Sequence, residues 1–224
     1  MINNKITTGK FTIPLFLISV CLFIFVALRI THEGAFLKTL DLKSLHWLTQ
    51  EFGTPHRNFE GNWFNHYMTF SATIGDVSGV IIMSLIITVV LMFRYKHIAL
   101  WFILTILSGT LMNILIKMTI ERTRPFNHLV VDKGYSFPSG HSNASTLLFV
   151  TMIFVIIPVI RHAILRYAML VIAIILWLSI LFCRLYFHAH YLTDVIGGVT
   201  LALAWIALWL AVYPLFKKLK LKGK

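Results

Sequence analysis

Lys-Met-Thr-Ile-Glu-Arg-Thr-Arg-Pro at residues 117–125 and Phe-Pro-Ser-Gly-His at residues 137–141 are the two parts of the segment that decides this fold. One apolar segment ends where this stretch begins, and another starts just after it. Between them the chain carries four fixed cations: Lys117, Arg122, Arg124 and Lys133. Fixed cations beside the N-terminus of a helix form a site for an anion, most naturally phosphate. The rest of the chain must hold this site and bring an anion to it.

The composition is that of a protein embedded in a membrane. Hydrophobic residues make up 58% of the 224 residues and charged residues only 12%, and the mean hydropathy is +0.82. A soluble domain has about 45–50% apolar and about 25% charged residues. No polar segment is long enough to form a second domain, so we predict a single membrane domain over residues 1–224. Cys21 and Cys183 lie in or at the end of apolar segments, and we expect no disulfide.

Six apolar segments are long enough to cross a bilayer, which takes about 20 residues per helix. They lie at approximately residues 11–29, 72–93, 98–117, 143–160, 167–185 and 195–213. The first resembles a signal peptide, but it is long for one and no small-residue cleavage site follows it, so we expect an uncleaved anchor. The pattern predicts an all-α bundle of six transmembrane spans.

The charges are divided unequally between the two sides of this bundle. Six spans place both termini on one side, whose basic residues are Lys5, Lys10, Arg94, Lys96, Arg161, Arg166, Lys217, Lys218, Lys220, Lys222 and Lys224. The acidic residues lie on or near the other side: Glu33, Asp41, Glu51, Glu60, Asp76, Glu121, Asp132 and Asp194. Basic loops stay in the cytoplasm, so we expect cytoplasmic termini and a site facing outward. We therefore attribute the net charge of +12 to the orientation of the protein in the membrane and to contact of the basic tail at 217–224 with anionic lipids. We do not expect the protein to bind nucleic acid.

The connection at about residues 30–71 is long, and long loops are usually functional or disordered. Apolar residues within 36–52 fall roughly on one side of a helix: Leu37, Leu40, Leu45, Trp47, Leu48 and Phe52. This pattern predicts an interfacial helix on the outer leaflet, with Trp47 at the depth of the lipid headgroups. A loop packed against the bundle fits the same pattern equally well.

A third polar block separates the last two predicted spans. It runs from Cys183 and Arg184 through His188 and His190 to Asp194. The predicted topology places this connection on the outer side too, so three polar blocks separated by apolar spans meet at one face of the bundle. A miscounted span would place them on opposite sides, so their agreement supports six spans independently.

The order and spacing of these blocks resemble the type-2 phosphatidic acid phosphatase (lipid phosphate phosphatase) family. The signature of that family is Lys-x6-Arg-Pro, then Pro-Ser-Gly-His, then Ser-Arg-x5-His-x3-Asp. The chain matches it at residues 117–125, 138–141 and 184–194. It departs from the signature at Cys183, where the family usually has serine. A thiol packs as a small apolar group and donates a weaker hydrogen bond.

The resemblance implies a role for each motif residue. The implied phosphate-binding residues are Lys117, Arg124, Ser139, Gly140 and Arg184. His190 would be the nucleophile that forms a phosphohistidine, Asp194 would hold one ring N–H of His190, and His141 would protonate the leaving group and then activate water. Phosphoryl transfer needs such a set of cations, an in-line nucleophile and a proton donor. We therefore expect neither a metal ion nor a cofactor.

Four further polar residues lie near the motifs without belonging to them. We expect Arg122 and Lys133 to be interface residues at a span end. His188 and His190 form His-x-His, which can bind metal, but no other ligands cluster with them in the sequence. Asp76 is an ionisable group near lipid, so it is either a functional candidate or a structural partner, and we leave it out of the core site.

The sequence therefore predicts a metal-independent hydrolase that acts on a lipid phosphate in the outer leaflet of a bacterial plasma (inner) membrane. The resemblance implies undecaprenyl pyrophosphate, phosphatidylglycerol phosphate or phosphatidic acid as substrate. Two other classes remain open. A lipid phosphotransferase would use the same residues, whereas a non-enzymatic lipid-binding or transport protein should have lost His141 or His190. No motif indicates the lipid tail or the oligomeric state.

Overall fold

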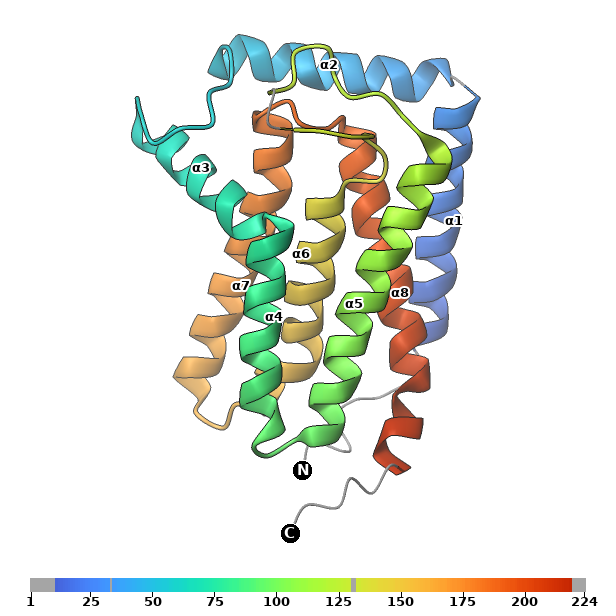
Figure 1. The fold of residues 1–224 in the computed structure, drawn as a ribbon, viewed down its shortest axis with the longest axis vertical. Helices are drawn as coiled ribbons and strands as arrows, with labels where there is room; N and C mark the ends of the chain where they lie inside the picture. Colours follow the sequence, from blue (N-terminus) through green and yellow to red (C-terminus); the bar gives the residue numbers. More distant parts are fainter. Residues whose placement is uncertain (1–10, 33, 130–131, 219–224) are drawn as a thin grey trace.

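The computed structural model describes residues 11–32, 34–129 and 132–218, and among these residues it contains helices and irregular segments but no strand. Five helices are long and apolar enough to cross a membrane, or up to six if a bent pair counts as one span. The five single helices are α1 (Thr12–Thr31), α5 (Lys96–Ile120), α6 (Gly140–Thr151), α7 (Ala163–Tyr186) and α8 (Leu192–Lys218). The span of α6 continues irregularly to Val159. These helices run side by side, which confirms the predicted membrane bundle (Figure 1).

The second predicted span is not a straight helix over residues 72–93. It consists of α3 (Trp63–Gly75) and α4 (Val77–Met92), which meet at an angle of 62°. Asp76 lies between them with extended backbone angles (φ −56°, ψ 147°), so the helical hydrogen bonding is interrupted there. Hydropathy locates apolar residues along the chain but carries no information about such a break. As a result α3 leans away from the bundle axis (Figure 1).

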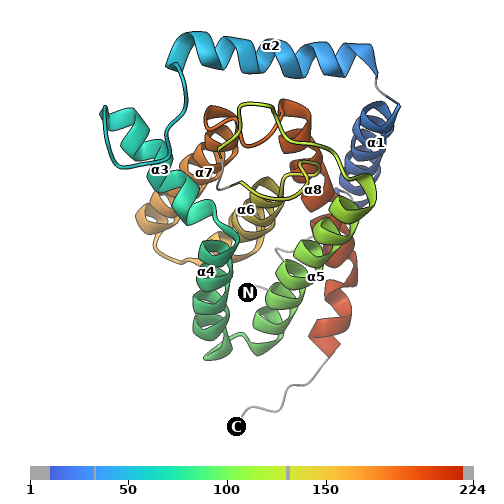
Figure 2. The same ribbon diagram turned by 45° about the horizontal axis from the view of Figure 1, so that its top comes forward.

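Helix α2 (Ala35–Phe52) lies across one end of the bundle, roughly perpendicular to the spans (Figures 1 and 2). The predicted helix in this connection is therefore present, and it packs against α1, α7 and α8. Its buried residues are Leu37, Asp41, Leu45 and Leu48, whereas Trp47 is half exposed. The amphipathic pattern thus buries one face against the bundle and leaves the other face outward.

Helix α6 is the centre of the bundle. Every residue from Ser142 to Thr151 is buried, because α4, α5, α7 and α8 all pack around this helix. The surrounding core includes Trp101, whose indole N–H donates to the carbonyl of Trp209 at 2.7 Å. The N-terminal end of α6 therefore opens in the middle of the bundle, under α2 (Figure 2).

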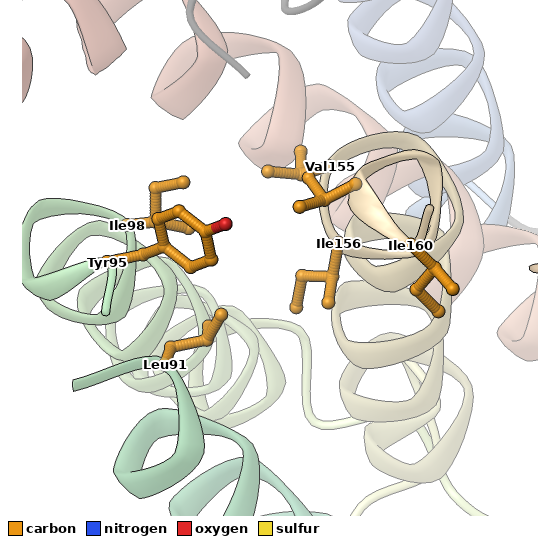
Figure 3. Close-up of a pocket in the computed structure, with 7 residues that line it drawn as sticks. Leu91, Tyr95, Ile98, Val155, Ile156 and Ile160 are labelled. Atoms are coloured by element: carbon orange, nitrogen blue, oxygen red, sulfur yellow. The ribbon is translucent and has the colours of Figure 1, made fainter. Parts of the chain in front are cut away.

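At its other end α6 becomes irregular. It continues as a π-helical turn at Met152–Ile156 and a 3₁₀ turn at Ile157–Val159, where Pro158 lacks the N–H that a regular helix requires. A cavity of about 150 Å³ lies beside this segment (Figure 3). The cavity is lined by Leu91, Tyr95, Ile98, Val155, Ile156, Val159 and Ile160. This lining holds no charged group, so the cavity is unsuited to phosphate.

Candidate active site

The three motif blocks meet at the end of the bundle that α2 covers. Lys117 lies in the last turn of α5, Ser139 and Gly140 begin α6, Arg184 lies near the end of α7, and Asp194 lies in the first turn of α8. The ends of these four helices lie together in both views of the ribbon (Figures 1 and 2). The structure thus brings together every residue that the sequence proposed for the site.

Ser139 starts α6 as its N-cap residue. Its Oγ accepts hydrogen bonds from the Ser142 N–H at 3.4 Å and the Ser142 hydroxyl at 2.9 Å, so its own hydroxyl hydrogen remains available to a ligand. The backbone approaches α8 closely here, because a Cβ on Gly198 would lie 2.6 Å from the Ser139 carbonyl oxygen. A Cβ on Gly140 would instead meet only Asn113 Oδ1, at 3.6 Å, so protein atoms do not crowd that side of the turn.

Arg184 is the most deeply buried cation of the site, with only 1% of its surface exposed. Its Nη2 donates to Asp132 Oδ1 at 2.7 Å, while Nε and Nη1 are buried without a hydrogen-bond partner among the described residues. Burial opposes ionisation of Asp132, but the Arg184 charge outweighs it and holds the pKa of Asp132 below its usual value. Leaving buried donors unpaired costs about 1–3 kcal/mol each, and more on a charged group. The free donors of Arg184 are suited to an anion.

Lys117 and Arg124 are held by backbone carbonyl groups, most of them in the connection between α5 and α6 and one in the connection between α7 and α8. The Lys117 ammonium donates to the carbonyls of Tyr135 at 2.7 Å and Ser136 at 3.4 Å. The Arg124 guanidinium donates to three backbone carbonyls, those of Lys133, Gly134 and Ala189. This scaffold fixes two positive charges close to the nucleophile proposed from the sequence.

His190 is that proposed nucleophile, and it is buried. Its Nε2 lies 3.4 Å from Arg124 Nη1, and its Nδ1 lies 3.5 Å from both Asp194 Oδ2 and Ser136 Oγ. Burial lowers the pKa of His190 well below its ordinary value, and the charges of Arg184, Arg124 and Lys117 lower it further. The ring is therefore neutral at pH 7, and a neutral ring nitrogen is nucleophilic. The contact with Asp194 is longer than a normal hydrogen bond, as catalytic contacts often are before substrate binds.

The carboxylate of Asp194 is fixed by groups other than His190. Its Oδ2 accepts from the Ser136 hydroxyl and from the Tyr191 N–H, which lies at 2.9 Å. Its Oδ1 accepts from Arg122 Nη1 at 2.5 Å. The carboxylate therefore faces the imidazole from a fixed position at the start of α8.

Arg122 is not the interface residue that we expected. Besides Asp194, it binds Asp41 Oδ2 at 2.7 Å and the Thr193 hydroxyl at 2.8 Å, and its guanidinium lies 4.3 Å above the ring of Tyr191. The two carboxylates, the Thr193 hydroxyl and the aromatic ring hold the side chain inside the protein. If the side chain extended to the membrane surface instead, all four contacts would break. Lys133, by contrast, is exposed.

Asp41 is a second residue that the sequence analysis did not assign to the site. It is 1% exposed on α2 and also accepts from the N–H of Thr193 at 2.9 Å and the Thr193 hydroxyl at 2.7 Å. An acid at the N-terminal turn of α8 is favourable for the helix dipole. The signal in the sequence was its register: Asp41 lies midway between Leu37 and Leu45, on the apolar face of α2.

His141 pairs with Asp76, which the sequence analysis left outside the core site. His141 Nε2 lies 2.7 Å from Asp76 Oδ1, and Arg57 Nη2 lies 2.6 Å from Asp76 Oδ2. Asp76 comes from the break between α3 and α4, and Arg57 comes from the connection that follows α2. The group therefore links the connection between α2 and α3 to the proposed acid–base residue.

A model of the PAP2 superfamily matches residues 98–218, a range that contains all of α5 except its first two residues, α6 to α8 and all three motif blocks. The chain belongs to the PAP2 superfamily. It is 34% identical to phosphatidylglycerophosphatase B of Bacillus subtilis (strain 168) over 145 residues, which cover 63% of this chain and 71% of that protein. The crystal structure of a transmembrane PAP2 type phosphatidylglycerolphosphate phosphatase from Bacillus subtilis covers 94% of this chain and 97% of its own, with a TM-score of 0.67 and 25% identity. This protein is a membrane PAP2 phosphatase related to phosphatidylglycerophosphatase B.

Two further residues of this PAP2 protein lie beside the site. His188 is buried, and its Nδ1 lies 2.6 Å from Asn127 Nδ2. Cys183, which replaces the family serine, is buried and contacts the Ile180 carbonyl at 3.1 Å through its sulfur. Within the described part of the chain, no three His, Cys, Asp or Glu side chains are grouped as metal ligands.

Proposed function

We propose that the protein hydrolyses a phosphomonoester or pyrophosphate of a membrane lipid through a phosphohistidine formed on His190. The observation that carries this proposal is Arg184, a cation 1% exposed whose Nε and Nη1 have no hydrogen-bond partner in the described structure. Two oxygens of a phosphoryl group match these donors, because guanidinium groups bind phosphate through paired N–H groups. The backbone N–H of His190 donates to the carbonyl of Arg184 at 3.3 Å, so Arg184 and His190 belong to one site, and we expect a phosphate held by Arg184 to face the nucleophile.

In the first step the lone pair on His190 Nε2 attacks phosphorus, and the bond from phosphorus to the leaving oxygen breaks. The Nε2 atom faces Arg124, while Nδ1 faces Asp194 and keeps its hydrogen. The ring becomes a phosphorylated imidazolium, whose positive charge Asp194 stabilises. Protonated His141 gives its proton to the leaving oxygen, so the lipid alcohol or lipid phosphate departs and His141 becomes neutral.

In the second step neutral His141 removes a proton from water, and the water oxygen attacks phosphorus. The bond from phosphorus to Nε2 breaks, inorganic phosphate forms, and His190 returns to its neutral state. His141 is protonated again, so the net reaction adds one water across one phosphate ester or phosphoanhydride bond. Lys117, Arg124 and Arg184 would stabilise the equatorial oxygens in both steps, which is the role that metal ions play in many phosphatases.

We propose an outer-leaflet lipid as the substrate. The site lies at the end of the bundle that carries α2, and the described chain starts and finishes at the opposite end (Figure 1). The basic residues at that opposite end favour a cytoplasmic position for the termini. The similarity to a protein of Bacillus subtilis supports a bacterial plasma membrane location. The exposed face of α2, with Trp47, would lie in the interface. The basic tail would touch anionic lipids, although residues 219–224 and the side chains of Lys217 and Lys218 lie outside the described structure.

Among possible lipids, phosphatidylglycerol phosphate is favoured by the name of the 34% identical relative. Undecaprenyl pyrophosphate and phosphatidic acid present the same terminal phosphate, and they are the alternatives that the test must separate.

The test is release of inorganic phosphate by the purified protein from these three lipids, with EDTA present. We expect release from at least one lipid, unchanged by chelation, and none from the His190→Ala variant. Complete loss of activity in EDTA that a divalent ion restores would overturn the fixed-cation chemistry. Transfer of phosphate to an added alcohol with no free phosphate would show a phosphotransferase, and inactivity on all three lipids would contradict the proposal.

A further inference from the structure

The carboxylate of Asp76 occupies an unusual position for a residue at the start of a helix. Asp76 is the N-cap residue of α4, where an aspartate normally accepts a hydrogen bond from the backbone of the first turn and stabilises the helix by about 1 kcal/mol. Its side chain makes no such bond within the described structure. Both carboxylate oxygens point elsewhere, Oδ1 to His141 and Oδ2 to Arg57. The Asp76 side chain therefore leaves the N-terminus of α4 uncapped and binds the proposed acid–base residue instead.

We propose that Asp76 is a positioning residue that holds His141 through Nε2 and leaves Nδ1 to exchange the proton with the leaving group and with water. This inference rests on the proposed function. At 2.7 Å the contact is a normal hydrogen bond, in which the Nε2–H donates and the carboxylate accepts. An imidazole bound through one nitrogen has its tautomer and its ring orientation fixed, so the other nitrogen carries out the chemistry.

The charges around His141 give Asp76 a second effect. Before the first step His141 must carry a proton and a positive charge, although its side chain is only 17% exposed and the charge of Arg184, a buried cation, acts on it. The negative groups that act on His141 are Asp76, in direct contact, and Asp132, which is already paired with Arg184. Asp76 therefore supplies the main compensation for the imidazolium.

Arg57 keeps the Asp76 carboxylate in place. It binds Oδ2 at 2.6 Å, so the carboxylate cannot turn back to cap α4 without breaking this ion pair. The Arg57 and His141 side chains are each 17% exposed, and Asp76 is 31% exposed, so the three groups form a partly buried row. The 62° break between α3 and α4 places Asp76 at the level of the first turn of α6.

Asp76 itself is not consumed or protonated in this scheme. In the first step the proton leaves His141 Nδ1 for the leaving oxygen, and in the second step Nδ1 regains a proton from water. The Nε2–H stays on the ring throughout, bound to Asp76. Loss of the carboxylate should therefore weaken proton donation while leaving attack by His190 intact.

The experiment compares turnover of a lipid phosphate with that of an aryl phosphate in Asp76→Asn. The lipid alkoxide is a poor leaving group and needs the proton, whereas a phenolate of low pKa departs with little help. General acid catalysis is typically worth about 10²–10⁴-fold, and we expect Asp76→Asn to lose a part of this, on the order of 10-fold or more, on the lipid. The loss of first-step rate on the aryl phosphate should be several times smaller. Glu51→Gln, which removes a charge from an exposed position on α2, should change neither rate.

A double-mutant cycle identifies His141 as the residue through which Asp76 acts. If Asp76 only positions His141, then Asp76→Asn should have little further effect in a His141→Ala background. Full additivity of the two substitutions would overturn the inference, as would equal losses on both substrates. Asp76→Glu keeps the charge and should recover part of the lipid turnover.

Folding and function are separated by two controls. If Asp76→Asn fails to fold, Arg57→Gln takes its place in the comparison. This variant keeps the Asp76 carboxylate but removes the ion pair that orients it, so it should lower turnover of the lipid phosphate more than turnover of the aryl phosphate. Equal effects of Arg57→Gln on the two substrates would then reject the inference. If the wild-type protein releases no phosphate from any substrate, the proposed function fails. An active wild type with unaffected Asp76 variants rejects only the role of Asp76.

Discussion

Arg122 donates to the carboxylate of Asp194 at a distance of 2.5 Å, although 72 residues separate them along the chain. The bond joins the segment that follows α5 to the first turn of α8, and Asp41 extends it to α2. The position of the acid that faces His190 is therefore set by three distant parts of the sequence.

Removal of Arg122 should destabilise the protein and reduce its activity. Breaking a buried ion pair by deleting one partner costs about 3–5 kcal/mol, and Arg122→Met would leave both Asp41 and Asp194 without their cation. Since Arg122 is 16% exposed, we expect the free energy of unfolding in detergent to fall toward the lower part of that range. Lys133→Met, at an exposed position, is the matched control. Equal unfolding free energies for the two variants would contradict the structural role.

Arg184→Lys should weaken phosphate binding even though the positive charge is retained. Lysine lacks the planar pair of N–H groups that Nε and Nη1 of Arg184 offer. Hydrogen bonds to charged groups contribute about 1.5–3 kcal/mol, which corresponds to about 10- to 150-fold in affinity. The measurement is competitive inhibition by inorganic phosphate, compared between the wild type and the variant. An unchanged inhibition constant would show that these two donors do not face the phosphate.

The acidic limb of the pH profile of kcat/KM should lie below pH 6.5. The nucleophile must be neutral, and burial together with Arg184, Arg124 and Lys117 lowers the pKa of His190 in the folded protein. His190 thus stays neutral while the pH falls through 6.5, and activity is lost only near its lowered pKa. Arg124→Gln removes one of these charges, so the limb should move to higher pH. Ionisation of the substrate is the same for both proteins, so it cannot cause a difference between their profiles. An acidic limb at the same pH in both proteins would show that it does not report the pKa of His190.

The two histidines should differ in the covalent intermediate. His190→Ala should form no phosphoenzyme, because it lacks the attacking nitrogen. His141→Ala should still form one from an aryl phosphate and should hydrolyse it slowly, since water is no longer activated. The intermediate is measured by quenching in base, in which phosphohistidine is stable, and in acid, in which it is labile. A base-stable phosphoenzyme in His190→Ala that is missing in His141→Ala would reverse the two roles.

Two phenylalanines allow a matched test of membrane orientation. Phe126, near the site, and Phe93, in the turn between α4 and α5, are 88% and 87% exposed. In a background with Cys21 and Cys183 changed to serine, an impermeant thiol reagent added to intact cells should label Phe126→Cys and spare Phe93→Cys. Labelling of Phe93→Cys alone would place the site in the cytoplasm and change the leaflet of the proposed substrate.

The bundle and the location of the site could be predicted from the sequence because both follow from local properties of the chain. A segment in a bilayer must satisfy its own backbone hydrogen bonds, so each apolar segment of sufficient length forms a helix. Strict alternation of apolar segments and connections then fixes which connections share a side. For this reason the order of segments alone assigns the blocks at Lys117, at residues 138–141 and at His190 to one end of the bundle.

The tertiary structure decided how the charged groups pair. Arg122 follows α5 and looked like an interface residue, while Asp41 and Asp76 were not assigned to the core site. Arg122 pairs with Asp41 across 81 residues of sequence, and Asp76 pairs with His141 across 65. Ion pairs depend on distances of a few ångströms between side chains, and these distances are set by how α2 crosses the bundle and where the α3–α4 span bends. Hydropathy is averaged along a segment and is insensitive to both features. The sequence by itself therefore determined which residues could carry the chemistry, and only helix packing determined which acid holds Arg122 and which acid holds His141.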